Sequence, residues 1–293
     1  MGPARTADDG RTVGEAISAA TVELGKGTDT ARLDAELLMA EALDCTRSDM
    51  FLRRMRDPEP AGYAALVARR AAHEPVAYIR GYQEFFGLGF RVTPDVLIPR
   101  GDSEVLIEAA LAARPAARRV LDLGTGSGAL LLAALSELPG AQGLGIDRSV
   151  AALSVATGNA RALGLAERAE LRLGDWTQPG WDAGLGQFDL ILANPPYVED
   201  AAELGPSVRG YEPAQALFAG SEGLDDYRIL MPRLPALLAP HGVALVEIGY
   251  RQAAAVTAIT AAAGLDARLH HDLSERPRAL ELTISLGKAA VPA

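Results

Sequence analysis

The spacing of apolar residues divides the 293-residue chain into three stretches. Up to about residue 75, apolar residues recur every three to four positions, which is typical of amphipathic helices. Over Phe86–Val92 apolar and polar positions alternate as in a strand, and together with Val76–Ile79 this pattern favours a β-hairpin. From Arg118 onward short apolar runs alternate with helical patterns, which predicts an α/β fold with a mostly parallel sheet.

Each stretch predicts particular elements. The first predicts a small helical bundle, with helices over Val13–Leu24, from Asp29 or Thr30 to Leu43, from a cap at Ser48 to Met55, and over Tyr63–Arg70. Asp102 or Ser103 can cap a helix over Val105–Ala113. The third stretch predicts strands at 120–123, 144–146, 171–173, 188–193 and 242–249, a closing pair at 267–271 and 279–285, and helices at 129–138, from 151, 221–238 and 252–263.

The tetrapeptide Asn194-Pro195-Pro196-Tyr197 follows the apolar run Phe188–Ala193. Two consecutive prolines have no N–H to donate, so the strand must end there, with Asn194 at its carboxyl end. Ligands of open α/β sheets bind just outside that edge. A stiff Asn carbonyl beside proline carbonyls is a set of acceptors for an NH2 group, and Tyr197 adds an aromatic surface. A plain strand-ending turn is the structural alternative.

A glycine-rich loop that follows the first predicted strand of the sheet is a second candidate site. Val120–Leu123 runs directly into Gly124-Thr125-Gly126-Ser127-Gly128, and an apolar helix follows. This context is that of a nucleotide site. Asp147 ends the next strand, about 20 residues after the loop, where an acidic residue typically binds ribose hydroxyls. The glycines are spaced more tightly than in a pyrophosphate loop, which favours S-adenosylmethionine over NAD.

Three further residues follow strands at the same edge. Asp175 could accept from an adenine amino group, and Trp176 could pack against the base, although a core position is the alternative for the indole. Glu247 lies near the carboxyl end of its strand, where it either faces the pocket or serves as a paired structural acid. The long polar stretch from Tyr197 to about Gly220 could cover a substrate.

Composition and charge exclude several classes of protein. The 28 basic and 38 acidic residues give a net charge of −10, which argues against a protein that grips long stretches of nucleic acid. One cysteine, Cys45, makes no intrachain disulfide, and the histidines lack metal-ligand spacing, so no metal is predicted. The sequence shows no targeting signal and no apolar run of about 20 residues, so a cytoplasmic protein without membrane contact is expected.

Taken together, the motifs resemble the PrmC/HemK family, the protein-(glutamine-N5) methyltransferases of peptide-chain release factors. The resemblance rests on Asp122–Gly128, Asp147, Gly174–Trp176, Asn194–Tyr197, Glu212-Pro213, Gly223–Tyr227 and Glu247–Gly249, and on Pro75, Tyr78-Ile79, Gly81, Phe85-Phe86 and Ile98–Arg100. It covers nearly the whole chain and is weakest over residues 1–70. Gly101 departs from the family, which usually has proline after the arginine, and this puts the rigidity of that loop in doubt.

The resemblance implies a fold, a reaction and a set of site residues. It implies a Rossmann-like class I S-adenosylmethionine-dependent methyltransferase with a helical bundle over 1–75, a β-hairpin connector over 76–100 and a methyltransferase domain over 101–293. The substrate would be the glutamine of the Gly-Gly-Gln motif of class I release factors, which the bundle would help to dock. Residues 194–197 would be catalytic, and residues 124–128, Asp147, Trp176 and Asn194 would bind S-adenosylmethionine.

Two other functions remain open at this point. The Asn-Pro-Pro-Tyr motif is shared with DNA adenine and some RNA guanine methyltransferases, against which the net charge and the lack of a basic recognition domain weigh. A nucleotide-binding dehydrogenase or a non-catalytic binding module is disfavoured by the tight glycine spacing and the intact Asn194 motif.

Overall fold

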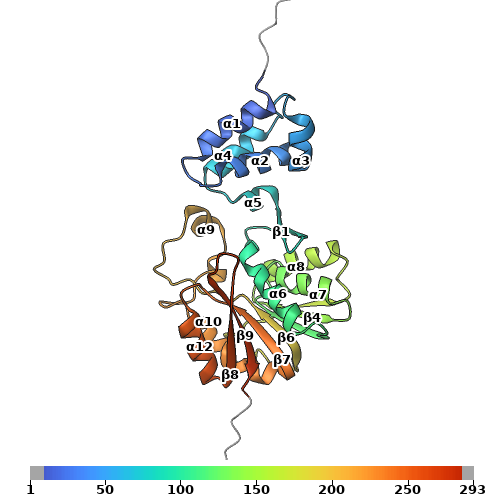
Figure 1. Ribbon diagram of the computed structural model, residues 1–293, viewed down its shortest axis with the longest axis vertical. Helices are drawn as coiled ribbons and strands as arrows, with labels where there is room; N and C mark the ends of the chain where they lie inside the picture. Colours follow the sequence, from blue (N-terminus) through green and yellow to red (C-terminus); the bar gives the residue numbers. More distant parts are fainter. Residues whose placement is uncertain (1–9, 286–293) are drawn as a thin grey trace, which may run out of the picture. The chain divides into compact units, whose positions relative to one another are not determined.

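The computed structural model describes residues 10–285, which form two compact units (Figure 1). The first unit contains the chain up to Gly81 together with Leu204–Tyr211. The second contains Tyr82–Glu203 and the chain from Glu212 onward. The short segment 204–211 therefore packs with the helical unit, although in sequence it lies between two strands of the other.

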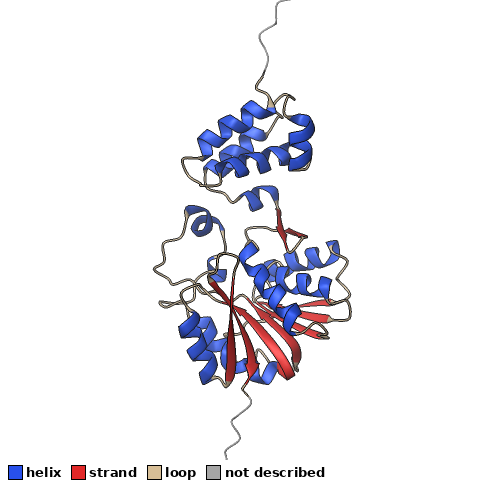
Figure 2. Ribbon diagram, in the orientation of Figure 1, coloured by secondary structure: helices blue, strands red, loops and turns tan. Residues whose placement is uncertain are grey.

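The first unit is helical (Figure 2). Helix α1 begins at a capping box, in which the Thr12 hydroxyl accepts from the Glu15 amide and the Glu15 carboxylate accepts from the Thr12 amide. Its core is aliphatic, with Ile17, Leu38 and Met39 fully buried. The elements are α1 (Val13–Leu24), α2 (Ala31–Ala42), α3 (Arg47–Asp49), the π-helical turn η1 (Met50–Arg54), α4 (Tyr63–Ala71), α5 (Val76–Arg80) and α9 (Pro206–Tyr211).

Two sequence-based expectations in this region are wrong. Helix α3 is capped by Thr46, whose hydroxyl accepts from the Asp49 amide, and not by Ser48. Val76–Ile79 is not a strand of the hairpin but the body of helix α5, because the carbonyl of Pro75 accepts from the amides of residues 78 and 79. Gly81, at φ +67°, then ends the helix.

The hairpin that follows belongs to the second unit. Its strands are β1 (Tyr82–Phe85) and β2 (Leu88–Arg91), and the rings of Phe85 and Phe90 meet edge to face with centroids 6.2 Å apart. Both rings are buried in the core of the second unit, which fixes the hairpin to the sheet domain.

The second unit is built on a seven-stranded sheet of order β5-β4-β3-β6-β7-β9-β8. Strands β5, β4, β3, β6 and β7 are parallel, and β9 is antiparallel to both β7 and β8. The expected sheet is thus confirmed. Its strands are β3 (Arg119–Leu123), β4 (Gln142–Asp147), β5 (Ala169–Leu173), β6 (Phe188–Ala193), β7 (Leu238–Glu247), β8 (Leu265–His271) and β9 (Pro277–Ile284).

Helices cover both faces of this sheet (Figure 1). Neighbouring residues of β3 point to opposite faces, so that Val120 joins one apolar core and Leu121 the other. The first core contains residues of α6 (Glu104–Ala113), α7 (Ala129–Glu137) and α8 (Val150–Ala162), and the second contains residues of α10 (Asp225–Leu230), α11 (Leu234–Leu237) and α12 (Ala253–Ala262). Short 3-10 turns lie at η2 (Gly101–Ser103), η3 (Ala214–Ala216) and η4 (Met231–Arg233).

The helix expected over 221–238 is wrong in length. Helix α10 begins only at Asp225, and the helical stretch is interrupted by η4 and ends at Leu237. Pro232 and Pro235 lie in this stretch, and because neither has an N–H, the regular hydrogen-bond ladder is broken. Leu238 already belongs to β7.

Within residues 10–285, none of the helices has the length and apolar character that crossing a membrane requires.

Candidate active site

The glycine loop and Asn194 follow two strands that lie side by side. Strand β3 pairs with β4 on one side and with β6 on the other, so the direction in which the chain builds the sheet reverses between β3 and β6. Leu123, the last residue of β3, is the register partner of Ala193, the last residue of β6. The two motifs therefore leave the same sheet edge at the switch point, where α/β folds bind ligands.

The loop backbone turns tightly at three glycines. Gly124, Gly126 and Gly128 have φ of +77°, +54° and +83°, a region that residues with a Cβ rarely adopt. The amides of Gly124 and Thr125 donate to the carbonyl of Ile146, at 2.9 and 3.0 Å. The loop is thus tied to the end of the neighbouring strand β4.

Asp147, at the end of β4, also supports the loop. Its Oδ2 accepts from the Gly126 amide at 2.9 Å, and its Oδ1 accepts from the Ser149 amide at 2.8 Å. The N-cap of α8 is provided by the hydroxyl of Ser149, which accepts from Ala152. Asp147 is therefore not the helix cap, and it lines the cavity described next.

A solvent-open cavity of about 910 Å³ lies at this sheet edge. Most of the predicted binding residues line it, namely Gly124, Thr125, Gly126, Ser127, Asp147, Trp176, Asn194 and Pro196. The connector contributes Phe85 and residues 95–100 to the lining, and η2 contributes Ser103.

Gly128, Pro195 and Tyr197 are not among the residues that line the cavity. A Cβ on Gly128 would lie 3.0 Å from Leu132 Cδ1 and 3.3 Å from Ala156 Cβ, so this glycine lets α7 and α8 approach the loop. Pro195 is buried directly after the strand end, and Tyr197 is half-buried beyond it.

Trp176 forms one wall of the cavity next to the loop. The indole is 8% exposed, and a Cβ on Gly124 would lie 3.0 Å from its Cη2 atom. Its Nε1 donates a 2.6 Å hydrogen bond to Asp226 of α10, which fixes the plane of the ring. Asp175 instead holds its own loop, because its Oδ1 accepts from the amide and hydroxyl of Thr177.

A buried carboxylate lies just before the glycine loop. The Oδ2 atom of Asp122 accepts from the Thr125 hydroxyl at 2.6 Å, while its Oδ1 atom is buried without a hydrogen-bond partner in the part of the chain that the structure describes. Burial raises the pKa of Asp122 to about 7, although the Thr125 hydrogen bond opposes that rise.

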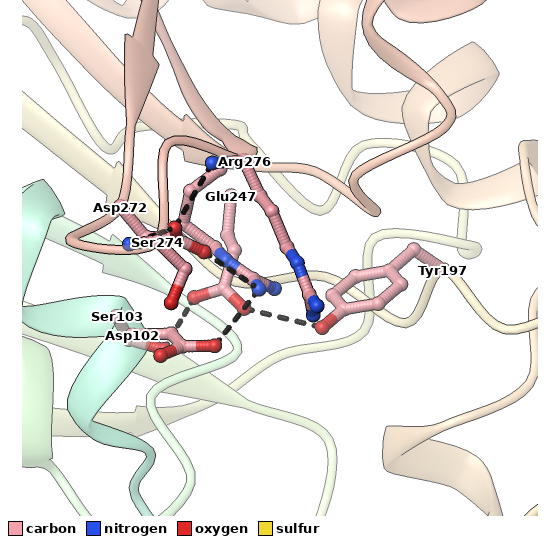
Figure 3. Close-up of polar contacts among 8 residues, drawn as sticks. Asp102, Ser103, Tyr197, Glu247, Asp272, Ser274 and Arg276 are labelled. Carbon is pink, nitrogen blue, oxygen red and sulfur yellow. Dashed lines mark hydrogen bonds and ion pairs between the residues drawn. The ribbon is translucent and has the colours of Figure 1, made fainter.

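The motif Asn194–Tyr197 is held by its backbone and by its last side chain. The amides of Tyr197 and Val198 donate to the carbonyl of Leu217, and the Tyr197 carbonyl accepts from Gln252 Nε2 at 3.0 Å. The Tyr197 hydroxyl donates to Glu247 Oε1 at 3.2 Å (Figure 3). The Asn194 side chain lines the cavity and makes no hydrogen bond within residues 10–285, so its amide is available to a ligand.

The connector and the loop after Tyr197 meet at another acid. Glu212, 6% exposed, accepts from the Ile98 amide at 3.3 Å and forms an ion pair with Arg100. This contact joins two separate motifs of the sequence, Glu212-Pro213 and the cavity-lining segment Ile98–Arg100.

Two residues that support the site were not predicted from the sequence. Asn159, near the C-terminal end of α8, bonds both to the backbone of Arg91 and to the carbonyl of Ser127 at 2.8 Å, and so ties the hairpin to the glycine loop. Gln252 bonds to the Tyr197 carbonyl and accepts from the Gly249 amide. An asparagine inside a helix, where it is a poor helix former, is the only sequence signal for the first.

Similarities to known proteins agree with this geometry. Residues 15–81 match the family model described as the PrmC N-terminal domain, and residues 116–248 match one described as a methyltransferase domain. A release factor glutamine methyltransferase of Rhodospirillum rubrum is 42% identical, over 95% of this chain and 87% of that protein. A release factor glutamine methyltransferase of Cereibacter sphaeroides is 47% identical, over 86% of this chain and 90% of that protein.

The chain belongs to the release factor glutamine methyltransferase family. A solved structure of a release factor-specific protein-(glutamine-N5) methyltransferase from Alicyclobacillus acidocaldarius is 28% identical, covers 67% of this chain and 99% of that one, and has a TM-score of 0.41. The family and the doubly covered sheet confirm the expected Rossmann-like methyltransferase fold, and S-adenosylmethionine is the methyl donor of this enzyme.

The residues present at the cavity fit that donor. The positive-φ glycines keep side chains away from the sheet edge, Trp176 offers an aromatic face, and Asp147 offers carboxylate oxygens. Among residues 10–285 there is no cluster of His, Cys, Asp or Glu side chains that could hold a metal ion.

Proposed function

We propose that this enzyme methylates the side-chain amide nitrogen, N5, of the glutamine in the Gly-Gly-Gln motif of class I peptide-chain release factors. The observation that carries the proposal is the position of Asn194. Its side-chain amide follows β6 at the switch point and lines the same cavity as the glycine loop. Family membership favours a carboxamide substrate over the amino group of adenine or guanine.

Binding of S-adenosylmethionine is assigned to the loop and its neighbours. Residues Gly124–Gly128 would approach the ligand with their backbone, Asp147 would accept from the ribose hydroxyls, and Trp176 would pack against the base. When bound, S-adenosylmethionine supplies an electrophilic methyl group on a sulfonium.

A carboxamide nitrogen is a poor nucleophile because its lone pair is delocalised. We assign to Asn194 Oδ1 and to the Pro195 carbonyl the role of accepting one N–H each from the substrate amide. This contact fixes the nitrogen and stabilises the positive charge that develops on it during the reaction. Orientation of this kind can supply up to about 7–11 kcal/mol of the barrier.

Pro196 and Tyr197 complete the assignment. Pro196 keeps the corner rigid, since two successive prolines fix their φ angles. Tyr197 would form an aromatic wall against the planar amide, and the excess proton would leave to water.

The helical unit is proposed to dock the release factor. Its sequence match to the PrmC N-terminal domain and its separate core support a module of its own, corresponding to residues 1–75 of the sequence, followed by the connector 76–100 and the methyltransferase domain 101–293. Because the substrate acts in translation termination, we assign the enzyme to the cytoplasm, with no direct nucleic acid or membrane partner.

The function is tested by incubating the enzyme with methyl-labelled S-adenosylmethionine and a class I release factor. Label is expected in the wild-type release factor and not in a variant with Gln→Ala in its Gly-Gly-Gln motif. Duplex DNA and tRNA serve as controls and are expected to take up no label. Equal labelling of both release factors, or labelling of a nucleic acid alone, would contradict the proposal.

A further inference from the structure

A buried hydrogen-bond network surrounds the hydroxyl of Tyr197 (Figure 3). Glu247, at the end of β7, is 2% exposed, and its two carboxylate oxygens have different partners. Oε1 accepts from the Tyr197 hydroxyl at 3.2 Å, and Oε2 accepts from the Ser103 hydroxyl at 2.5 Å. Each oxygen therefore has one hydroxyl donor, an arrangement that suits the ionised form.

The surroundings of Glu247 favour a fixed arrangement. Burial raises the pKa of Glu247, while the Ser103 hydrogen bond and the positive charge of Arg278 oppose that rise. Burial, followed by the charge of Glu247, raises the pKa of the Tyr197 hydroxyl, so the phenol keeps its proton and remains a donor at neutral pH. Arg278 is itself held by Asp102 at 2.9 Å and Asp272 at 3.2 Å.

The backbone of Tyr197 is held by different groups. Its amide donates to Leu217 at 3.2 Å and its carbonyl accepts from Gln252 at 3.0 Å. These contacts fix the chain but do not set the rotation of the side chain about its own bonds. The ring itself packs against the second apolar core, and at its far end the hydroxyl bonds to Glu247, which adds a directional constraint on the ring.

We infer that Glu247 is a positioning residue, which holds the ring of Tyr197 in the orientation that catalysis requires through the hydrogen bond to its hydroxyl. The inference rests on the proposed function, in which Tyr197 forms one wall for the substrate amide. Glu247 does not line the cavity and touches neither substrate nor donor in this scheme. It acts through Tyr197, which lies directly after the cavity-lining Pro196.

Glu247 and Tyr197 are therefore expected to act as one functional unit. Glu247→Gln removes the negative charge and replaces one of the two carboxylate oxygens with an NH2 group, which cannot accept from a hydroxyl, and Tyr197→Phe removes the donor. Each single variant is expected to lower kcat about tenfold or more, while the Kd for S-adenosylmethionine stays within about twofold. The double variant is expected to be no slower than the slower single variant, since both changes break the same contact.

The test measures kcat, KM and donor affinity for the two single variants and the double variant, with release factor as substrate. Asp189→Asn is the matched control, because it is also an acid-to-amide change on a strand of the same sheet. Its carboxylate accepts from the Arg118 and Arg119 amides at the opposite end of β6 from Asn194. It is expected to keep the wild-type kcat.

A thermal unfolding measurement of all variants separates positioning from general stability. If Glu247 only stabilised the fold, Glu247→Gln would lower kcat because less of the enzyme is folded. The variant would then recover the wild-type kcat at a lower temperature, where it is fully folded. Wild-type kcat in Glu247→Gln, or multiplying losses in the double variant, would overturn the inference while the proposed function stands. If the wild-type enzyme leaves the release factor unlabelled, the proposed function is overturned instead. The unfolding data would still show whether the hydrogen bond between Tyr197 and Glu247 stabilises the fold.

Discussion

A Cβ atom placed on Gly223 would lie 2.2 Å from the carbonyl oxygen of Tyr197 and 2.8 Å from Gln252 Nε2. Gly223 also has a φ of +65°. Its lack of a side chain thus allows the Gly-Leu-Asp segment to approach the backbone of the Asn-Pro-Pro-Tyr motif, and leaves room for the Gln252 hydrogen bond. Two motifs that are separate in sequence are therefore joined by a contact that only glycine permits.

Gly223→Ala is expected to displace Tyr197 and to lower turnover strongly. The left-handed backbone alone costs about 1–2 kcal/mol for a residue with a Cβ. Gly164→Ala is the matched control, because Gly164 has a φ of +70° and no atom of the described chain lies within 4 Å of the position that its Cβ would take. Urea unfolding and kcat are measured for both. Equal losses of stability with unchanged kcat in Gly223→Ala would show that the contact has no role.

Asn194→Ala is expected to abolish most turnover while leaving donor binding nearly intact. Loss of one preorganised hydrogen-bond partner at a reacting group typically lowers kcat by about 10²–10³-fold. Calorimetry with S-adenosylmethionine and labelling of a release factor are the two measurements. A variant that keeps wild-type kcat would refute the assigned role of Asn194. If the variant also loses binding of S-adenosylmethionine, Asn194 contacts the methyl donor and not the substrate amide.

The elements that the sequence predicts well are those with a local signal. Val13–Leu24 has both a capping box and a helical apolar spacing, and its predicted bounds match α1. The strand ends at Leu123 and Ala193 were predictable because glycines and prolines cannot continue a buried strand. Since both strands are parallel neighbours, local signals were enough to bring the loop and Asn194 to one edge.

The predictions that failed, or were never made, depend on distant residues. The four-residue run Val76–Ile79 is too short for its period to distinguish helix from strand, and Ile79 packs into the core of the bundle. Ser103 was expected as a possible cap for α6, but its hydroxyl bonds to Glu247, 144 residues away. Asn159 supports the glycine loop across 32 residues. Hydrogen bonds between residues so far apart leave no trace in the pattern of neighbouring residues, so they could not be predicted from it.

The raised pKa of Asp122 predicts how stability changes with pH. Because the pKa is about 7 in the folded protein and lower in the unfolded chain, the folded state holds the extra proton between these values. The contribution of Asp122 to stability is therefore fully present below about pH 4 and is lost as the pH rises toward about 7. Asp122→Asn removes this dependence, so the variant should gain stability relative to wild type across that range.

The two proteins are compared by urea unfolding at several pH values between about 4 and about 8, a range that spans the pKa of Asp122 in the unfolded and folded states. A difference of one pKa unit between the folded and unfolded states corresponds to about 1.4 kcal/mol in the free energy of unfolding. Thr125→Val, which removes a hydrogen bond that lowers the pKa of Asp122, should extend the loss of stability to higher pH. A difference between wild type and Asp122→Asn that does not change with pH would contradict the assignment.

Arg70 forms a buried ion pair with Asp34 inside the helical bundle and also bonds to the segment 204–211. The Arg70 Nε atom lies 2.7 Å from Asp34 Oδ2, and both side chains are 9% exposed. The Arg70 Nη1 atom also donates to the Ser207 hydroxyl at 3.0 Å, and the Tyr211 hydroxyl donates to the Ala72 carbonyl. Arg70→Ala would leave Asp34 buried without its charge partner, which typically costs about 3–5 kcal/mol.

Arg69→Ala is the matched control, one position away on the same helix. Arg69 pairs with Glu74 at the surface, with 45% of its side chain exposed, so its loss should cost less than about 1 kcal/mol. Hydrogen exchange read by mass spectrometry reports the bundle and the segment 204–211 separately from the sheet domain. Arg70→Ala should accelerate exchange in both, because one guanidinium holds them together, whereas Arg69→Ala should leave the segment protected. Equal exchange in the two variants would mean that the buried pair does not hold the segment.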